Sequence, residues 1–261
     1  MPKFETTDGV KLFYESVGEG QPLIMIHPPL MGHVVFKNQK ELAEHYRLIF
    51  LDLRGHGHSD RHVQNVSVPR LVEDLNELLT HLNLQKAAFL GYSAGGIICQ
   101  AFASHYPEKV SALILSGGFL KVDSLLLDLE FRLGMALLRW KRRGLLSKII
   151  AKSHSQNPRE QQELFDYGTK NDPGVVEAMY RELKNYDGTQ VAWHLENVPI
   201  LLMYGSKSYL KRYSQQMKTQ IDHAKLAYID KGNHQLPTLF SGPFNKIIDQ
   251  FLRNDTKAAL Q

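Results

Sequence analysis

The chain has 261 residues, of which 43% are hydrophobic and 22% charged, values typical of a globular protein with a buried core. The net charge of +4 is small, and no apolar stretch reaches the roughly 18 residues that suggest a membrane span. The single cysteine, Cys99, excludes an internal disulfide and a cysteine-based metal cluster. We therefore expect a cytoplasmic protein without a signal peptide, a cofactor or a metal site.

The first 118 residues alternate strand-like apolar runs with helical ones. Two extended runs flank Asp8-Gly9, a pair typical of a hairpin turn. Continuous apolar runs at 22–27 and 47–53 predict strands buried on both faces. Apolar residues at three- and four-residue spacing predict a helix over about 69–81, and the pattern continues with a strand at 86–91, a helix at 93–107 and a strand at 110–118. This alternation predicts a parallel sheet with helices on both faces.

The second half begins with a segment in which no buried strand is predicted. From about residue 119 to residue 197 the patterns are helical, with a long amphipathic helix at 124–143 and shorter helices at 158–168 and 173–186. Sheet-like patterns then return, with strands at 198–205 and 225–230 and helices at 209–221 and 241–254, the last one capped by Ser241. We predict an α/β core of residues 1–118 and 198–261, with the helical segment 119–197 inserted between the sixth and seventh strands. Such an insertion can cover the carboxyl ends of the strands, where open α/β sheets bind ligands.

The stretch LGYSAGG at residues 90–96 contains a G-x-S-x-G pattern, formed by Gly91, Ser93 and Gly95. It follows a predicted strand and precedes a predicted helix, the setting in which a tight turn lifts the serine side chain out of the sheet. Glycines on both sides leave room for that turn. The N–H groups at the start of the helix would favour developing negative charge. The pattern alone also fits an idle serine in a close-packed turn, but this setting favours a nucleophile.

Four motifs follow predicted strands: MIHPPLMG, LDLRGHGHSD, GYSAGG and DKGNHQ. With the helical insertion, they make the chain resemble the α/β-hydrolase superfamily over nearly its whole length. The resemblance implies an α/β-hydrolase fold, which is a mostly parallel eight-stranded sheet with helices on both faces and a helical lid after strand 6. It also implies that Ser93 is the nucleophile and His234 the general base, which takes the hydroxyl proton and returns it to the leaving group.

The other polar residues of these motifs have structural roles in such a fold. In the stretch from Asp52 to Ser59, Asp52 and Arg54 shape the backbone, and His56 and His58 belong to the same loop. His27 heads the oxyanion loop, where a structural hydrogen bond is usual.

The position of the catalytic acid departs from the family pattern. The family usually places an aspartate just after the seventh strand, and here Ser208 occupies that place. The acid fixes the histidine tautomer and stabilises the imidazolium, and a serine hydroxyl brings no charge. We rank Ser208 or a water first as the group that orients His234, Asp123 second and Asp230 third.

The oxyanion loop departs as well. Where the family often has H-G-x, this chain has His-Pro-Pro, so the expected donor falls on Pro29, which has no N–H. The second donor, the N–H of Ala94, is retained, and the N–H of Leu30 could replace the first if the loop shifts by one residue. Tyr92, beside the nucleophile, is expected to line the binding site.

These features predict a serine hydrolase of a small, apolar ester, thioester or lactone that forms an acyl-enzyme on Ser93. Two alternatives are left open by the atypical acid and oxyanion positions: a ligand-binding or sensory protein on a degenerate hydrolase scaffold, and a member that catalyses carbon–carbon cleavage or a lyase reaction. We expect a small-molecule substrate, no nucleic acid, no membrane span, and a monomer or homodimer. The basic run RWKRRG at 139–144 is interpreted as a solvated helix end rather than a membrane or nucleic-acid surface.

Overall fold

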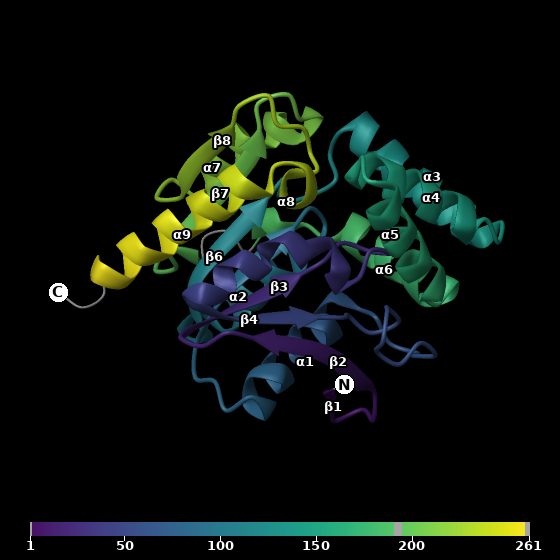
Figure 1. Ribbon diagram of the computed structural model, residues 1–261, viewed down its shortest axis with the longest axis horizontal. Coiled ribbons are helices and arrows are strands. Elements are labelled where there is room, and N and C mark those ends of the chain that lie inside the picture. The colour runs from purple at the N-terminus through teal and green to yellow at the C-terminus, as the bar shows by residue number, and fades with distance from the viewer. Residues whose placement is uncertain (1, 191–194, 259–261) are drawn as a thin grey trace.

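The strands form one twisted sheet that crosses the molecule, as Figure 1 shows for the computed structural model, which describes residues 2–190 and 195–258. Its order is β1-β2-β4-β3-β5-β6-β7-β8. The strands span β1 Lys3–Glu5, β2 Lys11–Val17, β3 Gln21–Ile26, β4 Tyr46–Leu51, β5 Ala87–Tyr92, β6 Val110–Ser116, β7 Ile200–Gly205 and β8 Lys225–Ile229. The pairs β1–β2 and β2–β4 are antiparallel, and the remaining pairs are parallel. The predicted fold class, a mostly parallel eight-stranded sheet, is confirmed.

Helices cover both faces of this sheet, and the alternation of side chains along β3 shows how. Ile24 and Ile26 point into a core formed with α1 (Val68–His81), α2 (Gly95–His105) and α7 (Arg212–Gln220). Leu23 and Met25 point the other way, into a core formed with the 3₁₀ helix η1 (His33–Glu44) and with α9 (Ser241–Ala258). A strand that is apolar on both faces is therefore buried on both faces, as its continuous apolar sequence predicted. Short helical turns complete the chain, namely η2 Pro107–Lys109, η3 Gly188–Gln190, η5 Tyr209–Lys211 and α8 Leu236–Leu239.

Four α-helices lie in the described part of the chain between β6 and β7, and in Figure 1 they lie together at one end of the molecule. They are α3 Leu125–Arg139, α4 Arg143–His154, α5 Pro158–Lys170 and α6 Pro173–Asn185. The single long helix expected over 124–143 is wrong at its end, because α3 stops at Arg139 and α4 begins four residues later. Lys141 takes a positive φ of 57°, and its N–H bonds to Leu138 O at 3.0 Å, which closes α3 with a turn. Residues 191–194 of the predicted insertion lie outside the described residues.

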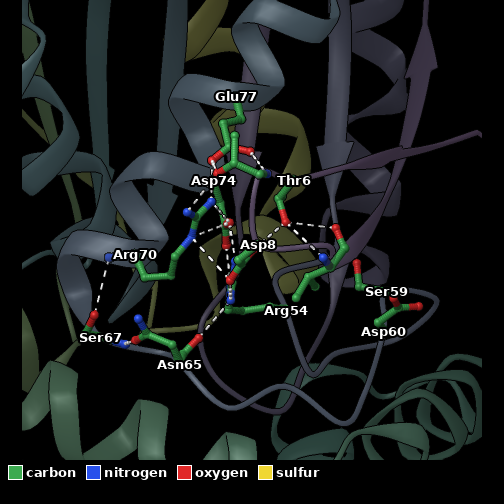
Figure 2. A network of polar contacts seen from close by, with 12 residues as sticks. Thr6, Asp8, Arg54, Ser59, Asp60, Asn65, Ser67, Arg70, Asp74 and Glu77 are labelled. Atoms are coloured by element: carbon green, nitrogen blue, oxygen red, sulfur yellow. Dashed lines mark hydrogen bonds and ion pairs between the residues drawn. The ribbon is translucent and has the colours of Figure 1, made fainter.

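The loop after β4 is fixed by a buried ion network around Arg54 (Figure 2). The Arg54 guanidinium donates to both carboxylate oxygens of Asp74 at 2.6 Å and to Asp8 at 2.9 Å. Arg70 also donates to Asp74, at 2.9 Å. Because Arg54 and Asp74 are fully buried, each needs the other to offset the loss of hydration. The network ties the Asp8–Gly9 hairpin turn and α1 to the loop, the structural role predicted for Arg54.

Candidate active site

Ser93 stands at the tight turn between β5 and α2. Its φ of 53° lies in the left-handed region, which a serine adopts only under constraint from its surroundings. A Cβ on Gly91 would lie 2.5 Å from Gly96 Cα, and one on Gly95 would lie 2.4 Å from Ile26 O. Both positions therefore accept only glycine, which explains the spacing of the G-x-S-x-G pattern.

His234 reaches this turn from the segment between β8 and α8. Its Nε2 lies 3.0 Å from Ser93 Oγ, within hydrogen-bond distance. The ring lies between two tyrosines, with the Tyr92 ring centroid at 5.2 Å and that of Tyr209 at 6.0 Å. The structure thus brings together the two side chains that the sequence assigned to nucleophile and base, although they stand 141 positions apart.

The other ring nitrogen of His234 has no partner. Nδ1 is buried and makes no hydrogen bond among the described residues. Gly117, the residue after β6, lies against it so closely that a Cβ there would be 2.7 Å from Nδ1. Burial, and to a lesser extent the charge that His154 can carry, lowers the pKa of His234 to about 3. The imidazole is therefore neutral at neutral pH.

None of the three groups ranked as partners of this nitrogen bonds to it. Ser208 Oγ accepts the Leu210 N–H at 3.2 Å and so caps the turn η5. The Asp123 carboxylate accepts from Gln216 Nε2 at 2.9 Å, and Asp230 is exposed. No carboxylate in the described part of the chain fixes the tautomer of His234.

The oxyanion loop offers few free donors. Pro29 has no N–H, and the Leu30 N–H donates to His56 Nε2 at 3.0 Å. The Leu30 carbonyl accepts from Asn171 Nδ2, so both backbone groups of Leu30 are occupied, and its φ is 75°. The N–H of Leu30 that we considered as a substitute donor is therefore engaged. The Ala94 N–H lies at the start of α2, where a helix provides no acceptor of its own.

The Ser93–His234 pair opens into a pocket of about 200 Å³ between the sheet and the helices α3, α4 and α6. Its walls are mainly apolar and include Pro28, Pro29, Met31, Leu127, Phe131, Leu133, Leu137, Leu146, Ile149 and Ile150. This volume is below the roughly 300–1,000 Å³ of sites for drug-sized ligands. The pocket can therefore enclose a small molecule or one end of a larger one.

Two polar pairs in this pocket had no signal in the sequence. The Tyr92 hydroxyl donates to His154 Nε2 at 3.0 Å, and burial lowers the pKa of His154 to about 4. The Tyr209 hydroxyl donates to Glu130, and burial raises the pKa of that carboxyl group. His154 and Glu130 belong to the helices α4 and α3, whose amphipathic sequences give no sign of which polar residue faces the pocket.

A larger cavity, of about 860 Å³, lies elsewhere and does not include Ser93 or His234. It is lined in part by His33, His58 and Tyr167, which surround the buried Asp52. The Asp52 carboxylate accepts from the Tyr167 hydroxyl at 2.7 Å and from the His33 and His58 N–H groups at 2.9 and 3.0 Å. Asp52 therefore holds the loop in place away from the nucleophile. Among the described residues, no group of histidine, cysteine and acidic side chains is arranged to hold a metal ion.

Comparison with known proteins agrees with this architecture. Residues 21–253 match the family described as alpha/beta hydrolase fold, and the chain therefore belongs to that family. The resemblance identified from the four motifs is thus confirmed.

One similar protein is the human serine hydrolase BPHL, which is 24% identical over 94% of this chain and 84% of its own length. Among solved structures, the esterase EaEST from Exiguobacterium antarcticum has a TM-score of 0.87 at 22% identity and covers 96% of this chain and 98% of its own. The enol-lactonase from Burkholderia xenovorans LB400 has a TM-score of 0.87 at 18% identity, with 97% of this chain and 100% of its own covered. At these identities the two structures establish the shared fold.

Proposed function

We propose that the protein is a serine hydrolase of small, apolar esters, thioesters or lactones. Ser93 Oγ attacks the carbonyl carbon of the substrate while His234 Nε2 takes the hydroxyl proton. The carbonyl electrons move to its oxygen, which the Ala94 N–H binds. When the oxyanion collapses, the bond to the leaving group breaks and His234 returns the proton to it. Water, deprotonated by His234, then attacks the acyl carbon; the bond from that carbon to Ser93 Oγ breaks, His234 returns the proton to Ser93 Oγ, and the acid product leaves.

The observation that carries this proposal is the 3.0 Å contact of Ser93 Oγ with His234 Nε2 at the base of an apolar pocket. Membership of the alpha/beta hydrolase fold family supports it, as does the similarity to a serine hydrolase and to an esterase. The apolar walls favour an uncharged acyl group, and the small volume favours a short one. In this proposal the helices α3–α6 act as the lid over the pocket.

The lack of a hydrogen-bond partner for His234 Nδ1 should lower the rate of ester hydrolysis. Attack requires the tautomer with its proton on Nδ1, and a buried N–H without an acceptor costs about 1–3 kcal/mol. In serine proteases, neutralising the aspartate of the catalytic triad lowers turnover by about 10⁴. We therefore expect good turnover only for activated substrates, whose leaving groups need little help from a proton.

The test is the release of p-nitrophenol from its acetate and butyrate esters. The wild type should form p-nitrophenol well above the rate of the buffer, and Ser93→Ala should bring the rate back to that of the buffer. Cys99→Ala is a matched control that removes the other nucleophilic side chain of this region, on α2, and should keep the activity. Equal rates for the wild type and Ser93→Ala would exclude the proposal.

The same unpartnered nitrogen and the occupied Leu30 N–H favour one second candidate, a ligand-binding protein that retains the scaffold. A fluorophosphonate probe separates the two, because it labels a serine only where the base activates it. Stoichiometric labelling that is lost in Ser93→Ala supports the hydrolase. Absence of labelling, together with binding of a small apolar ligand in the pocket, supports the binding protein.

A further inference from the structure

The helices α3 and α4 expose an unusual amount of apolar surface. Nine large apolar or aromatic side chains are exposed among the described residues, and seven of them lie on these helices or the turn between them. We call them the α3–α4 apolar surface, and they are Leu125, Leu126, Leu129, Leu133, Trp140, Leu145 and Ile149. Leu125 is 91% exposed and Trp140 71%. Exposed apolar side chains gathered on two helices that contact each other point to a site of interaction.

The spacing of these residues places them on common helix faces. Leu125, Leu129 and Leu133 follow one another at intervals of four, which aligns them along α3, and Leu145 and Ile149 do the same on α4. Each helix has a second apolar face that is buried, including Leu127 and Phe131 on α3. These buried side chains make the contacts of the helices with the core, so the exposed leucines are not needed for that packing.

This surface continues into the Ser93 pocket. Leu133 and Ile149 are each about half exposed, at 52% and 50%, and both also line the pocket. The mouth of the pocket therefore opens at the α3–α4 apolar surface. In Figure 1 the two helices lie at the end of the molecule opposite α9 and the C-terminus.

The same segment carries a concentration of positive charge. Between Glu130 and Glu160 the sequence has no acidic residue but eight basic ones, which exceeds the net charge of +4 of the whole chain. They are Arg132, Arg139, Lys141, Arg142, Arg143, Lys148, Lys152 and Arg159. Arg132 and Arg139 pair with acidic side chains, Asp128 and Glu177. Lys141, Arg142, Lys148 and Lys152 are exposed and make no ion pair within the described part of the chain.

We propose that the α3–α4 apolar surface docks on an anionic phospholipid bilayer. Leucine and tryptophan side chains insert into the boundary between head groups and acyl chains, and the flanking lysine and arginine side chains reach the lipid phosphates. A second copy of this chain fits less well, because it would bring two positively charged surfaces together. A protein partner also fits less well, because protein interfaces are depleted in lysine, and Lys141, Lys148 and Lys152 are three of the exposed unpaired charges of this segment.

Docking in this orientation turns the pocket mouth towards the bilayer. An acyl ester dissolved in the lipid could then enter past Leu133 and Ile149 without crossing water, with the rest of its chain left in the bilayer. This consequence rests on the proposed hydrolase function, whereas the docking itself does not. The docking proposal assigns the basic run at 139–144 to a membrane surface. The sequence alone favoured a solvated helix end, because the exposed leucines could not be recognised from it.

The test is co-sedimentation of the full chain with vesicles of phosphatidylcholine alone and with about 30% phosphatidylserine at physiological salt. The wild type should bind the anionic vesicles and leave the neutral ones largely unbound. The triple variant Leu125→Ser/Leu129→Ser/Trp140→Ser, which spares every residue of the pocket wall, should bind at least about tenfold more weakly. Lys141→Glu/Lys148→Glu should lose a similar factor. The matched control is Lys86→Glu/Lys246→Glu, which makes the same charge change on other elements and should bind like the wild type.

Ser93→Ala separates this inference from the proposed function, because it should bind vesicles like the wild type whether or not Ser93 is a nucleophile. Absence of wild-type binding to the anionic vesicles would overturn the docking proposal. Equal binding of the wild type and the triple variant would overturn it too. A wild-type dimer in solution that the triple variant converts to a monomer would show that a second copy covers the surface.

Discussion

Two buried polar regions of this protein, one around Arg54 and one around Ser93, are completed to different degrees. Around Arg54, each buried charge meets an opposite one, and the guanidinium shares its donors between Asp74 and Asp8. Arg54 holds the pKa of Asp8 well below its usual range. Around Ser93, by contrast, His154 and His234 are buried in the neutral form, and Nδ1 of His234 has no hydrogen-bond partner among the residues that the structure describes. The first region is built of paired charges, whereas the two histidines of the second are kept neutral.

The difference between the Arg54 and Ser93 regions shows which parts of the α/β-hydrolase sequence pattern the chain has kept. The loop motif around Arg54 serves stability, and every partner it needs is present. The catalytic pattern keeps the nucleophile and the base but replaces the acid with Ser208, whose hydroxyl caps a turn instead. Five buried side-chain atoms of the described residues have no hydrogen-bond partner, and His234 Nδ1 is the one that belongs to the Ser93–His234 pair. Such departures from full pairing are expected at functional sites. Four predictions test this contrast, beginning with the largest expected effect.

The Arg54 network should be costly to break. Asp74→Asn removes one buried charge and leaves Arg54 without its fully buried partner, which should lower the free energy of unfolding by about 3–5 kcal/mol. Denaturant unfolding measures it. Glu163→Gln, which breaks the exposed ion pair with Lys37, is the matched control and should change stability little. A loss for Asp74→Asn no larger than that of the control would show that the network does not bear on stability.

Restoring the missing acid should raise activity. Ser208→Asp places a carboxylate where the family has one, so that it can accept a hydrogen bond from the Nδ1–H of His234 and stabilise the imidazolium. We expect kcat for p-nitrophenyl acetate to rise by about 10²–10³, somewhat less than the factor that the aspartate contributes in serine proteases. The pKa of His234 should also rise from its present value of about 3, which would bring the acidic limb of the pH–rate profile towards neutrality.

Ser208→Asn is the matched control, because it has the shape of aspartate without the charge and should stay close to the wild type. If Ser208→Asp is no faster than Ser208→Asn, the orientation of His234 does not limit the reaction.

The sequence was sufficient for those parts of the fold and site that depend on local pattern. The succession of strands and helices along the chain follows from apolar runs that alternate with helical patterns, and the turn at Ser93 follows from glycines that no other residue can replace. The break between α3 and α4 was missed because Lys141 adopts a left-handed conformation without the glycine that usually marks it. His154 and Glu130 were missed because their positions depend on how α3 and α4 pack over the sheet. Tyr92 and His154 stand 62 positions apart and Glu130 and Tyr209 stand 79 apart, and contacts over such separations leave no periodic pattern in the sequence.

Lowering the pH should reduce the contribution of the Ser93 region to the free energy of unfolding before that of the Arg54 region. A buried histidine whose pKa falls from 6.5 to about 4 disfavours the folded state below the unfolded pKa, since the unfolded chain takes up the proton first. At about pH 5 this amounts to about 2 kcal/mol for His154. His154→Gln keeps an acceptor for the Tyr92 hydroxyl and cannot be protonated. The drop in its free energy of unfolding between about pH 7 and pH 5 should therefore be smaller than that of the wild type by this amount. Equal drops would mean that His154 is protonated in the folded protein.

The smallest effect concerns the choice of substrate. Glu130 is the one acidic side chain among the described residues that line the pocket, and no lysine or arginine lines it. Its carboxylate should repel a substrate that carries a carboxylate of its own. Glu130→Gln keeps an oxygen that can accept from Tyr209, so it removes the charge with little change of shape. Relative to p-nitrophenyl butyrate, the kcat/KM for p-nitrophenyl hemisuccinate, which has an acyl chain of the same length, should rise about tenfold.

A change of the same size for both esters would assign Glu130 to packing with Tyr209. A change confined to the charged ester would show that the second region also uses charge, here to select what enters the pocket rather than to hold the fold. The two regions would then differ in what their buried charges do, because those around Arg54 hold the fold and that of Glu130 selects the substrate.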